Sequence, residues 1–287
     1  MARYAYVNGR YVDHRDASVH IEDRGYQLAD GVYEVVGGRD GRLIDEGPHI
    51  DRLDRSLREL RIGWPVSRAA LGFVMRELMR RNRLRDGLVY MQVTRGVARR
   101  DHAFPTTPVK PALVLTTKNS KRGDADPGPG VAIKSQPDIR WERCDIKTVA
   151  LLPNVLAKQA ARESGAYEAW LIDADGCVTE GASTNAWIVT QDGELVTRQT
   201  NNGILAGITR QTLQSLCNAL QIKFVERPFS LAEAMKAQEA FITSATSFVT
   251  PVVKIDGQAV GDGKVGPMAR RLREEYVRFA ETGDPVT

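Results

Sequence analysis

The chain has 287 residues, of which 42% are hydrophobic and 26% charged, with a formal net charge of +4. A chain of this length buries roughly three quarters of its unfolded surface, so its core needs neither disulfides nor a structural metal. Cys144, Cys177 and Cys217 lie far apart and form no CxxC pair, so the cysteines indicate neither a zinc site nor a disulfide framework. The first ten residues are polar and no apolar run is long enough to cross a bilayer. We therefore expect a cytoplasmic protein that holds no metal and contacts no membrane.

The densest basic stretch, residues 76–85, raises an alternative of a different class. Leu71, Met75 and Leu78 recur on the opposite side of a helical pattern, which is typical of a solvated helix face. No aromatic interleaving or recognition motif accompanies the stretch. We expect no nucleic-acid partner, and a non-enzymatic adaptor that binds nucleic acid through these arginines is the alternative.

The chain opens with short apolar runs separated by turn residues such as Asn8-Gly9 and Asp40-Gly41, which is typical of β-hairpins. From His49 the apolar spacing changes to that of a helix, and Ser67 caps a second helix that runs to about Arg83. The first half closes with two strands, at residues 88–95 and 112–117, that are joined by an irregular loop.

Residues 119–130 are rich in Gly, Asp and Pro and predict a linker between two domains. Helical and strand-like patterns alternate again beyond the linker. The expected helices are residues 154–164, 209–220, 231–237 and 267–281, and the expected strands include residues 131–134, 223–228, 240–244 and 249–255. Helices and largely antiparallel hairpins are mixed in both halves, which predicts an α+β fold. We expect a smaller N-terminal domain, residues 1–118, and a larger C-terminal domain, residues 131–287.

Lys147 lies in the run from Cys144 to Leu152, where apolar residues on both sides predict a buried strand. An ammonium is costly to bury, and the neutral amine is the form that condenses with an aldehyde, so such a lysine suits Schiff-base chemistry. Taken alone, the run also fits a lysine that reaches solvent from a strand end or pairs with Asp145.

Three further stretches decide between these interpretations. The lysine run continues without a gap as Leu151-Leu-Pro-Asn-Val-Leu-Ala-Lys-Gln159, and it is followed by Val178-Thr-Glu-Gly-Ala-Ser-Thr-Asn185 and by Asn201-Asn-Gly-Ile-Leu-Ala-Gly-Ile-Thr-Arg210. In this order they resemble the motifs of class IV aminotransferases, the fold type IV enzymes that use pyridoxal 5'-phosphate. The resemblance implies two mixed α/β domains with the cofactor in the cleft between them.

The resemblance also assigns the residues that hold the cofactor. It implies that Lys147 forms the Schiff base and moves the Cα proton, and that Glu180 keeps the pyridine nitrogen protonated. The phosphate is expected at the amides of Ile208 and Thr209, where a glycine-containing loop enters a helix. By the same resemblance, Arg52 and Thr246 complete the phosphate site and Leu205 packs on the ring; Ser244 or Ser247 could replace Thr246.

The loop Thr94-Arg-Gly-Val-Ala-Arg-Arg-Asp-His-Ala-Phe-Pro105 bears on the substrate. It is similar to the carboxylate-binding loop of bacterial D-amino acid aminotransferases, with Arg100 and His102 as donors and Tyr33 as a third. Arg99 in place of Arg100 would shift this group by one position. The resemblance implies D-alanine and 2-oxoglutarate as substrates, and a homodimer, because the loop of those relatives reaches the neighbouring subunit.

Other members of the family remain alternatives. L-branched-chain and (R)-amine transaminases share the cofactor motifs, and an aminodeoxychorismate lyase would keep the lysine and the glutamate without needing the pair Arg100 and His102.

Overall fold

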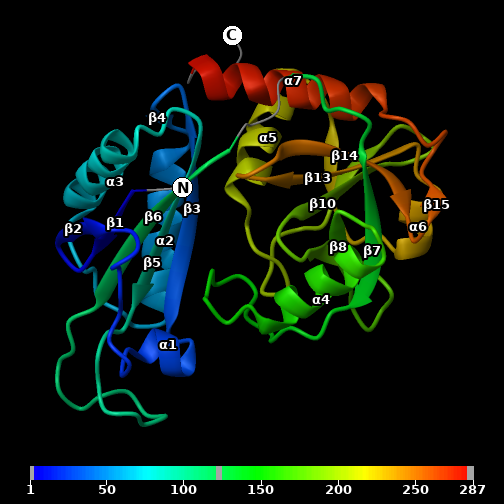
Figure 1. Ribbon diagram of the computed structural model, residues 1–287. Coiled ribbons are helices and arrows are strands. Elements are labelled where there is room, and N and C mark those ends of the chain that lie inside the picture. Colours follow the sequence, from blue (N-terminus) through cyan, green and yellow to red (C-terminus); the bar gives the residue numbers. More distant parts are fainter. Residues whose placement is uncertain (1–2, 121–124, 283–287) are drawn as a thin grey trace. The chain divides into compact units, whose positions relative to one another are not determined.

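The computed structural model describes residues 3–120 and 125–282. The chain divides into two compact units, one made of Met1–Arg122 with Ile146–Ala150 and the other of Gly123–Asp145 with Leu151–Thr287. Each unit combines helices with a sheet (Figure 1), which confirms the predicted α+β class. Of the predicted linker, residues 121–124 lie outside the described residues.

The first unit is built on an antiparallel sheet with the strand order β2-β1-β6-β5-β3-β4. Its strands are β1 (Tyr4–Val7), β2 (Arg10–Asp13), β3 (Gly31–Arg39), β4 (Arg42–Leu43), β5 (Gly87–Thr94) and β6 (Ala112–Asn119). Its helices are α1 (Arg24–Leu28), α2 (Glu46–Glu59) and α3 (Arg68–Asn82). The apolar stripes of α2 and α3 pack in one core with alternate residues of the sheet, among them Val32 and Val36 of β3. Side chains on β3 alternate between the two faces, so Glu34 lies on the core side and Tyr33 on the other.

Local sequence explains where the helices of this unit begin. The Ser67 hydroxyl accepts a hydrogen bond from the amide of Ala70, which confirms the predicted cap of α3. Helix α1 was not predicted, because five residues are too few for an apolar period. It begins where the Asp23 carboxylate accepts from the amide of Gly25.

Most arginines of the basic stretch, residues 76–85, are exposed and several form ion pairs, as expected of a solvated helix face. Arg76 pairs with Glu46, and Arg80 and Arg81 both lie 2.7 Å from carboxylate oxygens of Glu77. Neighbouring carboxylates thus neutralise part of its positive charge.

The second unit is built on a mixed sheet with the order β12-β11-β10-β13-β14-β7-β8-β9, to which β15 is added beside β14. Its strands are β7 (Val131–Pro137), β8 (Glu168–Ile172), β9 (Val178–Gly181), β10 (Asn185–Val189), β11 (Leu195–Thr197), β12 (Phe224–Glu226), β13 (Glu239–Ser244), β14 (Phe248–Ile255) and β15 (Gln258–Ala259). Its helices are α4 (Leu152–Glu163), α5 (Ile208–Ala219), α6 (Leu231–Met235) and α7 (Pro267–Thr282). The pairs of β7 with β14 and β8, and of β11 with β12, are parallel. The second core gathers around Trp170, Phe229 and Ile242.

The helices and strands that were expected in this unit with stated ranges are present, and each end lies at the expected residue or at most three residues from it. In residues 3–120 and 125–282, no helix is both long and apolar enough to cross a membrane.

Candidate active site

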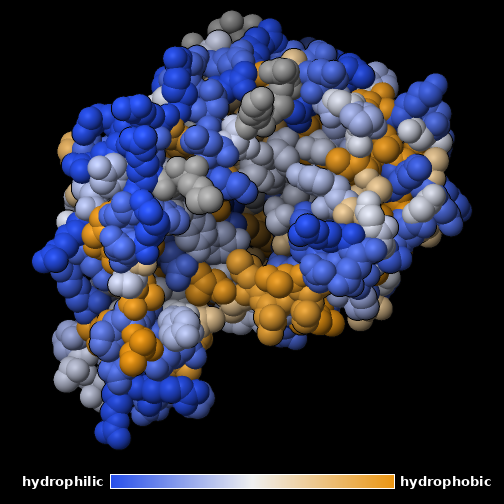
Figure 2. All heavy atoms as spheres, in the orientation of Figure 1, coloured by the Kyte–Doolittle hydropathy of each residue, from blue (hydrophilic) through white to orange (hydrophobic). Residues whose placement is uncertain are grey.

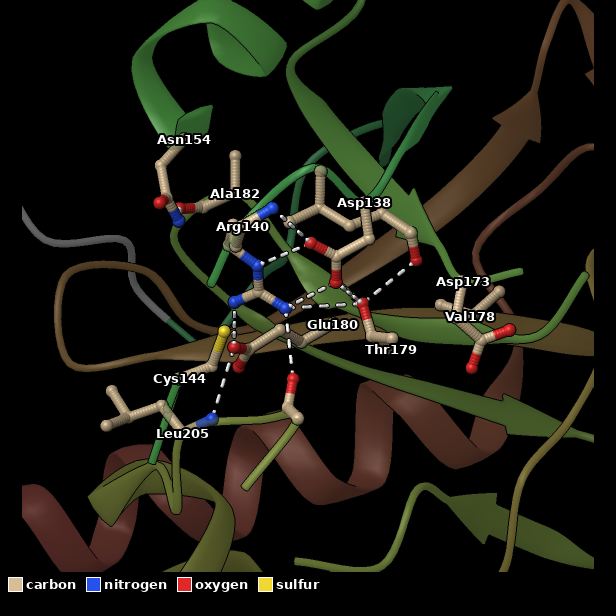
Figure 3. Close-up of polar contacts among 12 residues, drawn as sticks. Asp138, Arg140, Cys144, Asn154, Asp173, Val178, Thr179, Glu180, Ala182 and Leu205 are labelled. Atoms are coloured by element: carbon tan, nitrogen blue, oxygen red, sulfur yellow. Dashed lines mark hydrogen bonds and ion pairs between the residues drawn. The ribbon is translucent and has the colours of Figure 1, made fainter. Parts of the chain in front are cut away.

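Glu180 is a buried carboxylate on β9 with fixed donors on both oxygens. Every residue of β9 is buried, and Glu180 is 5% exposed. Its Oε1 accepts from Nη1 of Arg140 and from the amide of Leu205 at 3.1 Å (Figure 3). Its Oε2 accepts from Nδ2 of Asn185 at 2.9 Å. These donors compensate the cost of burying the charge.

Arg140 is itself held from the opposite side. Its Nε and Nη2 donate to the Asp138 carboxylate at 2.9 and 2.7 Å, and Nη2 also donates to the Gly203 carbonyl at 3.1 Å. Burial lowers the pKa of Arg140. The hydrogen bond to Asp138 and the charges of Glu180 and Asp138 raise it by more than burial lowers it, so the pKa lies above its ordinary value. The guanidinium is therefore a permanent positive charge beside Glu180.

Asn185 connects Glu180 to the beginning of α5. Its Nδ2 donates both to Glu180 and, at 3.0 Å, to the carbonyl of Leu205. A Cβ at Gly207 would lie 2.0 Å from Oδ1 of Asn185, so only glycine allows this approach. Gly207 is the N-cap of α5, and no side chain of the described residues caps this helix. The first amides of a helix lack partners within the helix and favour an anion.

The turn between β13 and β14 gathers hydroxyl groups. The Ser244 hydroxyl lies 3.0 Å from that of Thr246 and 2.8 Å from that of Ser247. Thr246 is exposed, whereas its two neighbours are partly buried. The three hydroxyls thus form one cluster, which leaves the choice among them open.

Lys147 lies on the edge of the sheet of the first unit. The prediction of a buried strand from Cys144 to Leu152 is wrong: Lys147 adjoins a single antiparallel bridge, Thr148 to Val32, and is only half-buried. The alternation of side chains explains this, because Ile146 turns into the core while Lys147 shares the opposite face with Tyr33.

The structure brings Lys147 and Tyr33 together. Nζ of Lys147 lies 4.2 Å from the centroid of the Tyr33 ring, and the Tyr33 amide donates to the Lys147 carbonyl at 2.9 Å. The Tyr33 ring stacks on Tyr90, with centroids 5.7 Å apart. Lys147, which was expected to hold the cofactor, and Tyr33, which was expected to bind the substrate carboxylate, therefore lie side by side on one face of the sheet.

Arg52 lies on α2 in a buried ion pair with Glu34. Its Nε and Nη2 donate to the two carboxylate oxygens at 2.7 and 2.8 Å, and Nδ1 of His49 donates to Oε2 at 2.8 Å. Burial raises the pKa of Glu34, but the charge and hydrogen bonds of Arg52 and His49 lower it more, to about 2. Arg52 is thus a fixed guanidinium and not a solvated surface residue.

Arg100 and His102 lie on an exposed loop of the first unit, residues 97–111. Neither side chain makes a hydrogen bond or an ion pair with the residues that the structure describes. The loop folds around a hollow of about 970 Å³. Among the described residues, no hydrogen bond, ion pair or ring contact joins either of them to Lys147 or Tyr33.

The polar partners of Glu180 were not predicted. Asn185 ends the recognised glutamate motif and so carried a signal, since a buried amide beside a glutamate indicates a hydrogen bond. Asp138 and Arg140 carried none, because they follow β7 on an irregular segment that no period or spacing marks.

The family follows from a comparison with known proteins. The family model for amino-transferase class IV matches residues 31–255, and the chain therefore belongs to the class IV aminotransferases. The D-alanine aminotransferase of Staphylococcus haemolyticus is 41% identical over 277 residues, which cover 96% of this chain and 98% of that protein. The resemblance inferred from the motifs is thereby confirmed.

Solved structures show that the fold is shared. The branched-chain amino acid aminotransferase of Escherichia coli matches with a TM-score of 0.89 at 24% identity, covering 97% of this chain and 94% of that one. The branched-chain amino acid aminotransferase of the archaeon Thermoproteus uzoniensis, solved with norvaline, matches with a TM-score of 0.83 at 25% identity, covering 96% and 94%. A further branched-chain enzyme, solved with pyridoxamine 5'-phosphate, matches with a TM-score of 0.88 at 24% identity, covering 99% and 96%.

Proposed function

We propose that this aminotransferase uses pyridoxal 5'-phosphate to transfer the amino group of a D-amino acid, such as D-alanine, to a 2-oxo acid, such as 2-oxoglutarate. The observation that carries the proposal is the buried Glu180 carboxylate with its fixed donors, in a chain 41% identical to a D-alanine aminotransferase. A carboxylate held in this way suits a protonated ring nitrogen. When bound, pyridoxal phosphate accepts the electrons that are released as the substrate Cα–H bond breaks.

The second unit offers groups that fit the rest of this cofactor. The uncapped N-terminus of α5 suits a phosphate, with the amides of Ile208 and Thr209 as donors. The hydroxyl of Thr246 is the expected additional donor. The backbone amide of Leu205 donates a hydrogen bond to the Glu180 carboxylate, which fixes the backbone there and leaves the Leu205 side chain available to pack on the ring.

Lys147 and Arg52 are the contributions of the first unit. Lys147 is proposed to bind the cofactor covalently and then to carry the Cα proton on Nζ, beside the electron-rich face of the Tyr33 ring. Arg52 is proposed as a phosphate ligand whose orientation Glu34 fixes.

Substrate choice is proposed to depend on Arg100, His102 and the Tyr33 hydroxyl, which would bind the substrate carboxylate. Cofactor-binding motifs alone do not separate D-amino acid from L-branched-chain or (R)-amine substrates. The preference for D-amino acids is supported by the similarity to the D-alanine aminotransferase of S. haemolyticus.

We also propose a homodimer. Leu152, Val155 and Leu156, spaced as one face of α4, are 68, 57 and 55% exposed. Figure 2 shows hydrophobic atoms gathered over this helix. A contiguous apolar face of this kind favours burial against another protein surface, and a second copy is the partner that the resemblance implies.

Single-turnover half-reactions test the function. The purified protein with pyridoxal phosphate is mixed separately with D-alanine, D-glutamate, L-leucine and (R)-1-phenylethylamine, and the cofactor absorbance is followed. We expect the fastest conversion with the two D-amino acids. A preference for L-leucine or for the amine would instead assign one of the alternative activities, and a colourless protein would exclude all of them.

A further inference from the structure

A buried ion-pair cluster lies beneath the loop that carries Arg100 and His102. The side chains of Arg24, Asp30 and Arg95 are 3, 11 and 10% exposed. Oδ2 of Asp30 accepts from Nε of Arg24 at 2.8 Å and from Nε of Arg95 at 2.7 Å, and Oδ1 accepts from Nη2 of Arg95 at 3.0 Å. One carboxylate therefore fixes two guanidinium groups in the interior of the first unit.

Arg24 connects this cluster to the exposed loop. Its Nη1 donates to the carbonyl oxygen of Asp101 at 2.6 Å. Asp101 is the residue between Arg100 and His102, so the position of its carbonyl sets where both neighbouring side chains begin. A single guanidinium thus bridges a buried carboxylate and the centre of the loop.

Arg95 supports the far side of the same loop. Its Cζ lies 3.8 Å from the centroid of the Phe104 ring, a stacked cation–π contact. Its Nη2 and Nη1 donate to the carbonyls of Leu60 and Arg61 after α2, at 2.8 and 3.0 Å. The cluster therefore connects the loop to the helical layer of the unit.

Few other contacts hold the loop. Its entrance is fixed by the amide of Arg24, which donates to the Gly96 carbonyl, and by the amide of Ala98, which donates to the Glu22 carbonyl. Among the described residues, no backbone–backbone hydrogen bond holds residues 99–111. The conformation of the loop at Arg100 and His102 thus depends on side-chain anchors.

We propose that Arg24 is a positioning residue for recognition of the substrate carboxylate: it acts through the Asp101 carbonyl to fix Arg100 and His102. This inference rests on the proposed function, in which those two residues bind the carboxylate. A guanidinium is suited to the role because two of its nitrogens serve two acceptors at a fixed separation, whereas a lysine has one nitrogen. Displacement of binding groups by about 1 Å is enough to weaken the substrate binding that those groups provide.

The test compares Arg24→Met and Arg24→Lys with wild type and with Lys134→Met. The control removes one partner of Asp256 in the other unit, where Lys134 lies 2.8 Å from the carboxylate and Ser135 also donates to it. Full-length proteins with pyridoxal phosphate are assayed for kcat and KM with D-alanine. The rate of trypsin cleavage after Arg99 and Arg100 is measured in parallel, with fragments identified by mass, because it reports the freedom of the loop without any turnover.

We expect Arg24→Met to raise KM for D-alanine about tenfold with kcat changed less than about twofold, and to accelerate cleavage in the loop by a similar factor. Arg24→Lys keeps the charge beside Asp30 and should lie between Arg24→Met and wild type. Lys134→Met should match wild type in both measurements.

The inference is overturned if a folded Arg24 variant keeps the wild-type KM, whether or not cleavage accelerates, or if Lys134→Met changes KM as much as Arg24→Met does. A different result separates the two hypotheses: if wild type does not convert D-amino acids, the proposed function fails, while the cleavage rates still decide whether Arg24 anchors the loop.

Discussion

The surroundings of Glu180 and those of Arg100 and His102 differ in burial and in the number of polar contacts that hold the side chains. Glu180 is buried and has donors on both carboxylate oxygens, all from the second unit. Arg100 and His102 are exposed and make no polar contact of their own with the described residues. The difference teaches that the group proposed to act on the cofactor is preorganised, whereas the groups proposed to select the substrate lie on a loop that can vary. Family members can then share the chemistry and differ in substrate.

Replacing Lys147 gives the largest expected effect, because Lys147 is proposed to hold the cofactor that Glu180 contacts and on which the substrate reacts. In Lys147→Ala we expect transamination to fall by about 10³-fold or more, since the covalent anchor and the base are lost together. Borohydride treatment followed by peptide mass analysis should find the cofactor adduct at position 147 in wild type and not in the variant. An adduct on another lysine would contradict the assignment.

The preorganisation of Glu180 is tested by Arg140→Met. The change leaves a buried carboxylate without its cation and lowers the free energy of unfolding by about 3–5 kcal/mol. Thermal or urea unfolding of the apoprotein measures this without any turnover. If the unfolding free energy of Arg140→Met stays within about 1 kcal/mol of wild type, the network is not preorganised.

Arg143→Met is a control for that measurement. Arg143 also pairs with a buried carboxylate, Asp145, at 3.0 Å, but its own side chain is 37% exposed. Solvent screens such a pair, so we expect a loss below about 1 kcal/mol.

Glu34, His49 and Arg52 form a comparable buried network in the first unit. The pH dependence of the free energy of unfolding tests this network. The pKa of Glu34, about 2 against an ordinary 4.5, is lowered by folding. The lowered pKa stabilises the fold above about pH 5, and the contribution is lost as the pH falls towards 2. In Glu34→Gln this part of the acid dependence is absent, so the difference in unfolding free energy from wild type should shrink by roughly 3 kcal/mol over that range. Equal acid dependence in urea titrations would contradict the ion pair.

The sequence predicts the regular segments of this chain better than its irregular ones. Periodicity and caps located α3 behind Ser67, and the glutamate motif located Glu180, because both depend on local pattern. Arg140 could not be predicted, since its contact with Glu180 joins residues 40 positions apart through an irregular segment. The half-buried edge position of Lys147 was missed for a related reason: an apolar run does not reveal which face of a sheet is covered.

Arg100→Met tests the exposed loop and has the smallest expected effect on the free energy. Because Arg100 is exposed and unpaired among the described residues, the change should leave the unfolding free energy within about 0.5 kcal/mol of wild type. It should raise KM for D-alanine about tenfold, which corresponds to about 1.4 kcal/mol of lost carboxylate binding. Arg99→Met, one position away on the same exposed loop, is the matched variant and should leave KM within about twofold of wild type. If the two variants exchange these results, the carboxylate group is shifted by one residue; if neither changes KM, the loop does not select the substrate, and the contrast with the Glu180 network loses its functional meaning.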